Sequence, residues 1–217
     1  MNNTENLYEK RKVYEKYQLT ENEVKTNPIE QFRNWFLEAE ENPQISEANA
    51  MSVSTIEEDG CPRTRMVLLK SYNWEGFIFY TNYESRKGKS IEKTKKACLH
   101  FFWPNLERQI IIKANLEKIA ENLSDGNFHS RPKGSQLGAV VSPQSREIPN
   151  RDFLENRLQE LEKTYENREI PRPENWGGYI AKPYEIEFWQ GRPNRLHDRI
   201  LYTLTEDFDW KISRLAP

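Results

Sequence analysis

The chain begins with a polar stretch, residues 1–26, followed by a segment whose hydrophobic residues recur at helical spacing. From Ile29 to Ala39 these residues fall on one face, and an Asn-Pro pair stands both before and after the segment. Asparagine caps a helix, proline suits its first position, and an Asn-Pro pair ends one. A second segment of this kind runs from Phe153 to Tyr165. The pattern predicts two amphipathic helices and, for the polar stretch, a mobile arm or a short helix that is ordered only in contact with something else.

Between these helices hydrophobic residues alternate with polar ones, as in β-strands with one covered face. Strands are expected at residues 51–56, 64–70, 77–81, 97–103 and 109–119 and again after Trp176, with turns at 58–60 and 73–76 and a helix at 85–94. Residues 123–141 show only a weak pattern. Five or six strands at this spacing predict a closed or nearly closed antiparallel barrel. We therefore expect a mainly β fold with flanking helices (α+β), in a single domain over residues 27–217.

The segment 184–199 combines a strand pattern with a basic cluster. Ile186–Trp189 alternates as a strand does, and a glycine and a proline then interrupt it. Arg195, His197 and Arg199 follow at two-residue spacing. If that run is also extended, three cationic or titratable groups project from one face, near an indole. Because like charges repel at short range, the cluster predicts a bound anion or polar ring. The alternative is a solvated strand edge whose charges oppose aggregation.

Composition narrows the function classes. The 217 residues are enough for one substantial domain, and 6 Trp, 10 Tyr and 10 Phe supply a core. The formal net charge of -2 argues against a general nucleic-acid binder, and no apolar run is long enough for a membrane span or a signal peptide. Two cysteines and three scattered histidines offer neither a disulfide framework nor metal-ligand spacing. We expect a cytoplasmic protein without a metal.

Cationic residues recur at the ends of the predicted elements. Arg65 and Lys70 stand at the two ends of an apolar strand, where a cation can simply extend into water. The recurrence changes this interpretation, because several cations at element ends can converge on a bound phosphate. The others are Arg86, Lys87, Arg131, Arg195 and Arg199. The chain lacks GxGxxG and GxxxxGK, so the pattern indicates a mononucleotide rather than a dinucleotide or P-loop site.

The motifs resemble those of one known family. IEFWQGRPNRLHDR (186–199) and the final RLAP closely resemble the C-terminal signature of pyridoxine/pyridoxamine 5′-phosphate oxidases. RMVLLK, FYTNYESRKGKSIE, LERQ, SRPKGSQLGA and SPQSREI also resemble that family's motifs, in its order. The resemblance runs from roughly Arg11 to Pro217, nearly the whole chain.

The resemblance implies an FMN-binding split β-barrel that forms a homodimer, with FMN at the subunit interface. The implied reaction is the oxidation of pyridoxamine 5′-phosphate and pyridoxine 5′-phosphate to pyridoxal 5′-phosphate, in vitamin B6 biosynthesis or salvage. A hydride equivalent passes from the C4′ carbon of the substrate to flavin N5, and O2 is reduced to hydrogen peroxide. The protein's part is then positioning and electrostatics. No nucleic-acid or membrane partner is expected.

The resemblance also assigns site residues. Implied FMN contacts are Arg65, Met66, Val67, Leu68, Leu69, Lys70, Tyr80, Thr81, Arg86, Lys87, Gln109, Gln144, Ser145, Trp189 and Arg199. Lys70, Asn127, Arg131 and Ser135 fall where the family holds the substrate phosphate, and Arg195 and His197 fall beside the pyridine ring as the catalytic pair. In the arm, Arg11 and Tyr14 resemble an RxxY pair that closes over the substrate as a lid, and this gives residues 1–26 an expected role.

The chain departs from the family pattern at two places. Asn127 stands where the family usually has a tyrosine that joins the phosphate site, and the arm lacks the Gly-Gly often found after RxxY. Two other functions stay open: a non-catalytic split-barrel flavoprotein that binds or carries pyridoxal 5′-phosphate, and a flavin reductase that uses NAD(P)H. The reductase does not explain the phosphate-binding set around Arg131. Peroxide formation from pyridoxamine 5′-phosphate distinguishes all three.

Overall fold

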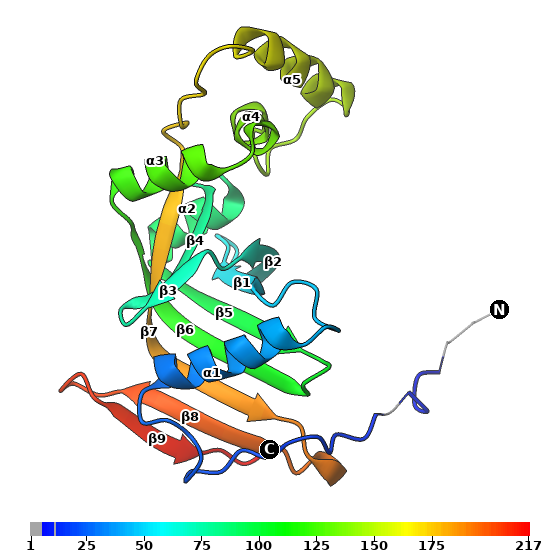
Figure 1. Cartoon of the computed structure of the whole chain (residues 1–217), viewed down its shortest axis with the longest axis vertical. Coiled ribbons are helices and arrows are strands. Elements are labelled where there is room, and N and C mark those ends of the chain that lie inside the picture. Colours follow the sequence, from blue (N-terminus) through cyan, green and yellow to red (C-terminus); the bar gives the residue numbers. More distant parts are fainter. Residues whose placement is uncertain (1–5, 11) are drawn as a thin grey trace. The chain divides into compact units, whose positions relative to one another are not determined.

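The computed structural model of the 217-residue chain describes residues 6–10 and 12–217. The helices are α1 (Pro28–Glu41), α2 (Arg86–Thr94), α3 (Glu121–Ser130), α4 (Lys133–Val141) and α5 (Asp152–Thr164), with a 3-10 turn η1 (Pro193–Arg195). The strands are β1 (Ala50–Ile56), β2 (Pro62–Leu68), β3 (Ser71–Asn73), β4 (Gly76–Asn82), β5 (Lys96–Trp103), β6 (Arg108–Lys118), β7 (Trp176–Gln190), β8 (Asp198–Leu204) and β9 (Trp210–Arg214). Figure 1 shows these elements along the chain.

Within the described residues the strands form one nine-stranded sheet in the order β2-β1-β5-β6-β7-β4-β3, with β8 paired to β7 and β9 to β8. The pairs β1–β2, β1–β5, β3–β4, β4–β7, β7–β8 and β8–β9 are antiparallel. The expected mainly β fold with flanking helices is confirmed. By internal contacts the chain divides into a first unit (Met1–Ala48, Phe101–Ile111, Glu185–Pro217) and a second unit (Asn49–His100, Ile112–Tyr184).

In the first unit, helix α1 forms where the sequence predicts it. The Asn27 side chain accepts a backbone N–H of the first turn at 2.8 Å, which satisfies one of the free donors at the helix start. The buried face of α1 packs on strand residues: the ring centroids of Phe32 and Phe101 lie 5.2 Å apart, as do those of Trp35 and Phe188. Each such buried ring stabilises the fold by about 1.5–3 kcal/mol.

In the second unit, β1 and β2 form the predicted hairpin, whose turn uses a left-handed backbone at Gly60 (φ 81°). Strand β4 pairs with the first part of β7, where Tyr80 stands opposite Gly178. A Cβ on Gly178 would lie 2.4 Å from Cδ1 of Ile119, and one on Gly177 would lie 2.2 Å from the Tyr83 hydroxyl. The Gly-Gly pair therefore permits the close approach of these side chains to β7.

Helices α3 to α5 surround a small core of their own in the second unit. Phe128, Leu137, Ile170 and Trp176 are buried together there, and residues of α5 pack against them. The predicted second amphipathic helix is confirmed as α5, although none of its residues is fully buried. Helices α3 and α4 occupy the segment with the weak sequence pattern. They bury only two residues each, so little hydrophobic periodicity was available to predict them.

Arg195, His197 and Arg199 would share one face only if the run after Gly191 were extended, and the structure does not meet this condition. Strand β7 ends at Gln190, the turn η1 follows, and β8 begins only at Asp198. Asn194 and Arg195 both adopt a left-handed backbone, with φ of 56° and 62°. A proline at the head of η1 cannot donate to a strand ladder, which favours a turn there. Only Arg199 of the three lies in a strand.

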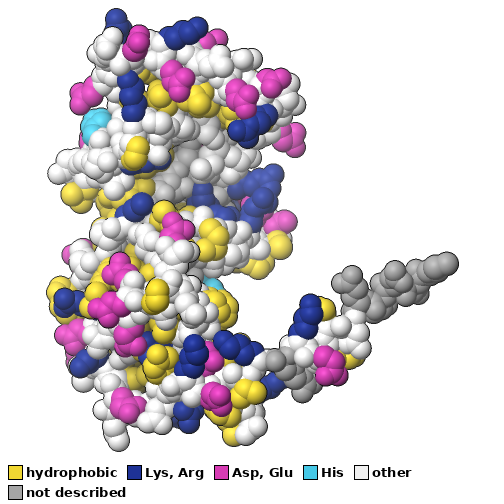
Figure 2. Space-filling view, turned by 45° about the vertical axis from the view of Figure 1, so that its right-hand side comes forward, with side chains coloured by type: hydrophobic (Ala, Val, Ile, Leu, Met, Phe, Trp, Pro, Cys, Tyr) yellow, Lys and Arg dark blue, Asp and Glu magenta, His cyan; other side chains and the backbone are white. Residues whose placement is uncertain are grey.

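No helix formed by the described residues is long and apolar enough to cross a membrane. Figure 2 shows acidic and basic side chains intermixed over most of one face, with a dense group of Lys and Arg side chains right of centre. Such a mixture agrees with a net charge near zero. The assignment of residues 27–217 to one domain, and of residues 1–26 to a mobile lid, stays a prediction.

Candidate functional site

The second unit contains a cavity of about 790 Å³ between the β2 and β4 strands and the α2 and α3 helices. Most of the residues expected to contact FMN or a substrate phosphate lie in its wall. They are Arg65, Met66, Val67, Leu68, Lys70, Tyr80, Thr81, Arg86, Lys87, Asn127, Arg131, Ser135, Gln144 and Ser145. Leu69 is not among them, because it is 4% exposed and belongs to the core.

All the charged side chains in the wall of this cavity are positive. Its wall contains six cationic side chains and no aspartate or glutamate. Apart from Arg63, which pairs with Glu57 at 3.6 Å, none of these cations forms an ion pair within the described residues. Arg65 instead donates to Val53 O at 3.1 Å and to Thr55 Oγ1 at 2.8 Å. Like charges without counter-charges are unfavourable, so the cavity is suited to an anion.

Lys87 is the most buried of these cations. It lies in the first turn of α2, which Ser85 caps as predicted, and its Nζ donates to Thr81 Oγ1 at 2.8 Å, Ser85 Oγ at 3.2 Å and Gln144 Oε1 at 2.6 Å. All three acceptors are neutral. Burial, and then the positive charge of Arg65, lower the pKa of the Lys87 ammonium to about 8. An anion in the cavity would raise that pKa again.

Arg131 follows helix α3 and faces the same cavity. Its guanidinium lies 4.8 Å from the ring centroid of Trp176, and the Tyr80 ring stacks on that indole at 5.4 Å. Nη1 of Arg131 is buried and has no hydrogen-bond partner among the described residues. Burial lowers the pKa of Arg131, because the charged form lacks compensation there. A buried donor without a partner costs free energy, so a ligand acceptor at this point would be favourable.

The first unit contains a second cavity, of about 730 Å³. Tyr14 of the arm and Arg195 and His197 of the segment after β7 line it, together with Lys10, Lys12, Val13, Arg192 and Asn194. The ring centroid of His197 lies 4.6 Å from that of Trp189, and the Tyr14 centroid lies 5.8 Å from Trp189 and 5.9 Å from His197. The turn η1 thus brings Arg195 and His197 to one cavity without an extended strand.

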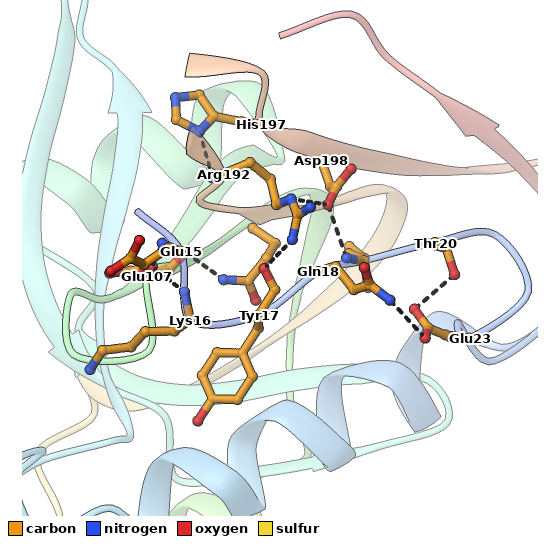
Figure 3. Close-up of polar contacts among 12 residues, drawn as sticks. Glu15, Lys16, Tyr17, Gln18, Thr20, Glu23, Glu107, Arg192, His197 and Asp198 are labelled. Atoms are coloured by element: carbon orange, nitrogen blue, oxygen red, sulfur yellow. Dashed lines mark hydrogen bonds and ion pairs between the residues drawn. The ribbon is translucent and has the colours of Figure 1, made fainter. Parts of the chain in front are cut away.

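His197 has a defined proton arrangement in this cavity. The backbone N–H of Arg192 donates to Nδ1 of His197 at 3.1 Å, as Figure 3 shows. The neutral imidazole therefore carries its proton on Nε2, where it is available as a donor. Burial, followed by the charge of Arg195, lowers the pKa of His197, and Asp198 opposes this in part. The ring is consequently neutral near pH 7.

Two further residues expected to contact FMN, Gln109 and Arg199, do not line this cavity. Arg199 forms a two-bond ion pair with Glu187 across β7 and β8, at 2.8 and 3.0 Å. Its charge is therefore already compensated. Gln109 lies in β6 and is half-buried. Arg11 lies outside the described residues.

Three residues of these surroundings were not predicted from the sequence. Trp176 provides the ring on which Arg131 and Tyr80 stack, although the sequence indicated only the start of a strand there. Glu107 and Arg192 make hydrogen bonds to the arm. Glu107 belongs to the LERQ motif, which was the one available signal, but a carboxylate in a motif does not reveal its partner 91 or 92 residues away.

Comparison with known proteins agrees with these observations. A family model described as pyridoxamine 5′-phosphate oxidase matches residues 37–165, and one described as the pyridoxine 5′-phosphate oxidase C-terminal dimerisation region matches residues 176–217. The pyridoxine/pyridoxamine 5′-phosphate oxidase of Flavobacterium psychrophilum is 59% identical over 207 residues, which are 95% of this chain and 97% of the relative.

Two solved structures share the fold. PhzG from Burkholderia lata 383, in complex with tetrahydrophenazine-1-carboxylic acid, matches with a TM-score of 0.85 and 28% identity over 92% of this chain and 98% of its own. A pyridoxamine 5′-phosphate oxidase-related, FMN binding protein from Nostoc punctiforme matches with a TM-score of 0.68 and 16% identity, over 86% and 97% of the two chains. The predicted split-barrel fold and the resemblance read from the motifs are both confirmed, and the chain belongs to the pyridoxine/pyridoxamine 5′-phosphate oxidase family.

Proposed function

We propose that this protein is an FMN-dependent oxidase that converts pyridoxamine 5′-phosphate and pyridoxine 5′-phosphate to pyridoxal 5′-phosphate, with O2 reduced to hydrogen peroxide. The observation that carries the proposal is the cavity of the second unit, with six cations and no carboxylate in its wall. Both the proposed cofactor and the proposed substrates carry a phosphate, and they would supply the missing negative charge. The name of the F. psychrophilum relative and the family match support the same reaction.

The donor groups of that cavity fit FMN. Arg65, Arg86 and Lys87 are suited to its phosphate, since a buried ammonium with only neutral acceptors favours an anion. The amide of Gln144 and the hydroxyls of Thr81 and Ser145 can bond the sugar-alcohol chain or the edge of the ring system. The name of the N. punctiforme protein records FMN binding in a chain of this fold.

The substrate phosphate has its own proposed partners in Lys70, Arg131 and Ser135. The unpartnered Nη1 of Arg131 supports this assignment, because a phosphate oxygen would satisfy a buried donor. Asn127 of α3 lines the same cavity and can contribute an amide donor in place of the family's tyrosine hydroxyl. These contacts lie away from the reacting carbon, so they fix the position of the substrate rather than its reactivity.

Arg195 and His197 are proposed to orient the pyridine ring. FMN, held by Arg65, Arg86 and Lys87, would supply the acceptor for a hydride equivalent from C4′ of the substrate and the route of both electrons to O2. The neutral His197 can donate its Nε2 proton in a hydrogen bond to the phenolic oxygen of the pyridine, while Arg195 places a positive charge beside the ring. Tyr14 can exclude water above them.

We further propose that the chain acts as a cytoplasmic homodimer with FMN at the subunit interface. The match of residues 176–217 to a dimerisation region supports the dimer. The purified protein should then be yellow, run as a dimer by light scattering and contain one FMN per chain. A colourless monomer that takes up no added FMN would contradict this part of the proposal.

The reaction is tested by mixing the purified protein with pyridoxamine 5′-phosphate in air and measuring hydrogen peroxide and the aldehyde product together. We expect both in equal amounts, and much slower turnover with pyridoxamine, which lacks the phosphate. If FMN and pyridoxal 5′-phosphate bind but no peroxide forms, the protein is a carrier instead. If NAD(P)H reduces the flavin directly, it is a reductase.

A further inference from the structure

Glu107 is a buried carboxylate to which the proposed reaction gives no role. It lies at the end of the turn between β5 and β6, its side chain is 2% exposed, and its backbone is left-handed with φ of 55°. A buried carboxylate and a left-handed non-glycine residue each cost free energy. Because both free-energy costs fall on Glu107, we expect a favourable contact that offsets them.

The compensation comes from the N-terminal arm. Oε2 of Glu107 accepts the backbone N–H of Glu15 at 2.9 Å and of Lys16 at 3.1 Å, as drawn in Figure 3. The ammonium of Lys12 lies 3.7 Å from Oε1. Hydrogen bonds from N–H groups to an ionised acceptor are among the stronger ones in proteins. One carboxylate therefore holds two consecutive peptide groups of the arm.

Glu107 also holds the segment that carries the proposed ring-binding residues. Its carbonyl oxygen accepts the backbone N–H of Gly191 at 2.7 Å. Gly191 in turn faces Tyr14, and a Cβ added to Gly191 would lie 2.8 Å from both Cβ and Cγ of Tyr14 and 3.1 Å from Cβ of Glu107. Tyr14 thus reaches Trp189 and His197 only because residue 191 has no side chain.

The arm is attached at further points on the C-terminal side of this contact. The Tyr17 ring lies 4.7 Å from the guanidinium of Arg108, and Tyr17 O accepts from Arg192 Nη1 at 3.0 Å. The N–H of Leu19 donates to Asp198 at 3.0 Å. The two backbone bonds to Glu107 come directly after Tyr14, and the exposed side chain of Lys12 adds a contact before it, with Nζ donating to Pro104 O at 3.5 Å.

We propose that Glu107 is a positioning residue that latches the arm at Glu15 and Lys16 and so holds Tyr14 against Trp189 and His197. Residues 15–19 stay attached during turnover, and they keep Tyr14 beside His197. The inference rests on the proposed function for its catalytic consequence, but the latch itself is a structural statement that is tested separately.

Limited trypsin digestion tests the latch directly. In the wild type the Lys16 N–H bonds to Glu107, and its Nζ donates to Asn105 O at 2.7 Å, so the bond after Lys16 should be cut slowly. Glu107→Met keeps the volume and removes the acceptor, and we expect cleavage after Lys16 at least tenfold faster. Glu107→Gln retains one acceptor oxygen and should fall between the two. Glu9→Met, a change at an exposed arm residue, is the matched control and should match the wild type.

A second variant, Gly191→Ala, tests the same contact without changing Glu107. It leaves the carboxylate intact, but its added Cβ takes the space that Tyr14 occupies. It should show the same faster cleavage after Lys16. In peroxide assays both Glu107→Met and Gly191→Ala should raise KM for pyridoxamine 5′-phosphate severalfold more than they lower kcat, with flavin content unchanged.

Unchanged cleavage in Gly191→Ala together with unchanged cleavage in a folded Glu107→Met would overturn the latch. If Glu107→Met does not fold, Gly191→Ala alone decides. Faster cleavage with unaltered KM would show that the arm is latched but that Tyr14 does not serve the substrate, which overturns the positioning role. A wild-type protein without oxidase activity would refute the proposed function, while the digestion would still decide on the latch.

Discussion

The lowered pKa of Lys87 leads to a prediction about how FMN binding depends on pH. In the ligand-free chain the ammonium has a pKa of about 8, because it is buried and lies near Arg65 without a counter-charge. A bound phosphate dianion favours the protonated form, so the pKa rises in the complex. Above pH 8 the free site has lost its proton, and binding must take one up. The affinity for FMN should therefore be greatest below pH 8 and fall as the pH rises through 8.

The size of the effect follows from the shift. If the phosphate restores the pKa of Lys87 from about 8 to the usual lysine value of 10.5, the linked free energy is about 3.4 kcal/mol at most. Between pH 8 and pH 9 the dissociation constant should rise about fivefold, between pH 9 and pH 10 about sevenfold, and above pH 10.5 it should level off. The second ionisation of the phosphate, near pH 6, is complete well below this range and does not interfere.

Whereas the affinity for FMN should fall with rising pH, the contribution of Lys87 to the stability of the ligand-free protein should rise. A lysine whose pKa is lower in the folded chain binds fewer protons there than in the unfolded chain between pH 8 and 10.5. The contribution of Lys87 to the free energy of unfolding therefore rises with pH in that window. Because other lysines and tyrosines also titrate there, the contribution is read as the difference between wild type and Lys87→Met.

Quenching of FMN fluorescence at pH 7 to 9.5 measures the dissociation constants. Lys87→Met should bind FMN more weakly at pH 7 and lose the pH slope. Lys89→Met, on the exposed face of the same helix, should keep both the wild-type affinity and the slope. A flat wild-type profile, or an equal slope in Lys87→Met, would refute the assignment of Lys87 to the cofactor phosphate.

Three further predictions concern single residues. Arg195→Leu should leave flavin content near normal while kcat/KM falls by one to two orders of magnitude, since a charged contact is worth about 1.5–3 kcal/mol; loss of FMN with activity per flavin unchanged would contradict this. Asn127→Tyr should lower KM for pyridoxamine 5′-phosphate by up to about tenfold with kcat little changed, because the phosphate contact acts alike in ground and transition states; steady-state kinetics showing a higher KM would count against it. Gly177→Ala should lower the free energy of unfolding by about 1–3 kcal/mol in urea titrations, because its Cβ would meet the Tyr83 hydroxyl at 2.2 Å. Gly134→Ala, with open space around it, should be neutral or slightly stabilising, and equal losses in the two variants would refute the packing argument.

Local chemistry in the sequence determined the parts of the fold whose causes are local. The Asn27 cap and the Ser85 cap depend on residues two or three positions away, so both helix starts were predictable. The alternation of buried and partly buried residues along β1, and the turn at Gly60, likewise depend on neighbouring residues and were predictable for the same reason. That the cations around Arg65 and Lys87 gather at one site was also predictable, both from their recurrence and from the resemblance of their motifs to the family.

Tertiary structure decided the features whose causes lie far apart in the chain. Whether Arg195 stands in a strand or a turn depends on where the strand ladder stops, and the two-residue spacing fits both. Glu107 reads as an ordinary loop carboxylate until the fold places it beneath Glu15 and Lys16, 92 and 91 residues away. Trp176 acquires its role only when Arg131 and Tyr80 stack on it. In each case the deciding free energy comes from burial and hydrogen bonding between distant segments, which residue order alone does not contain.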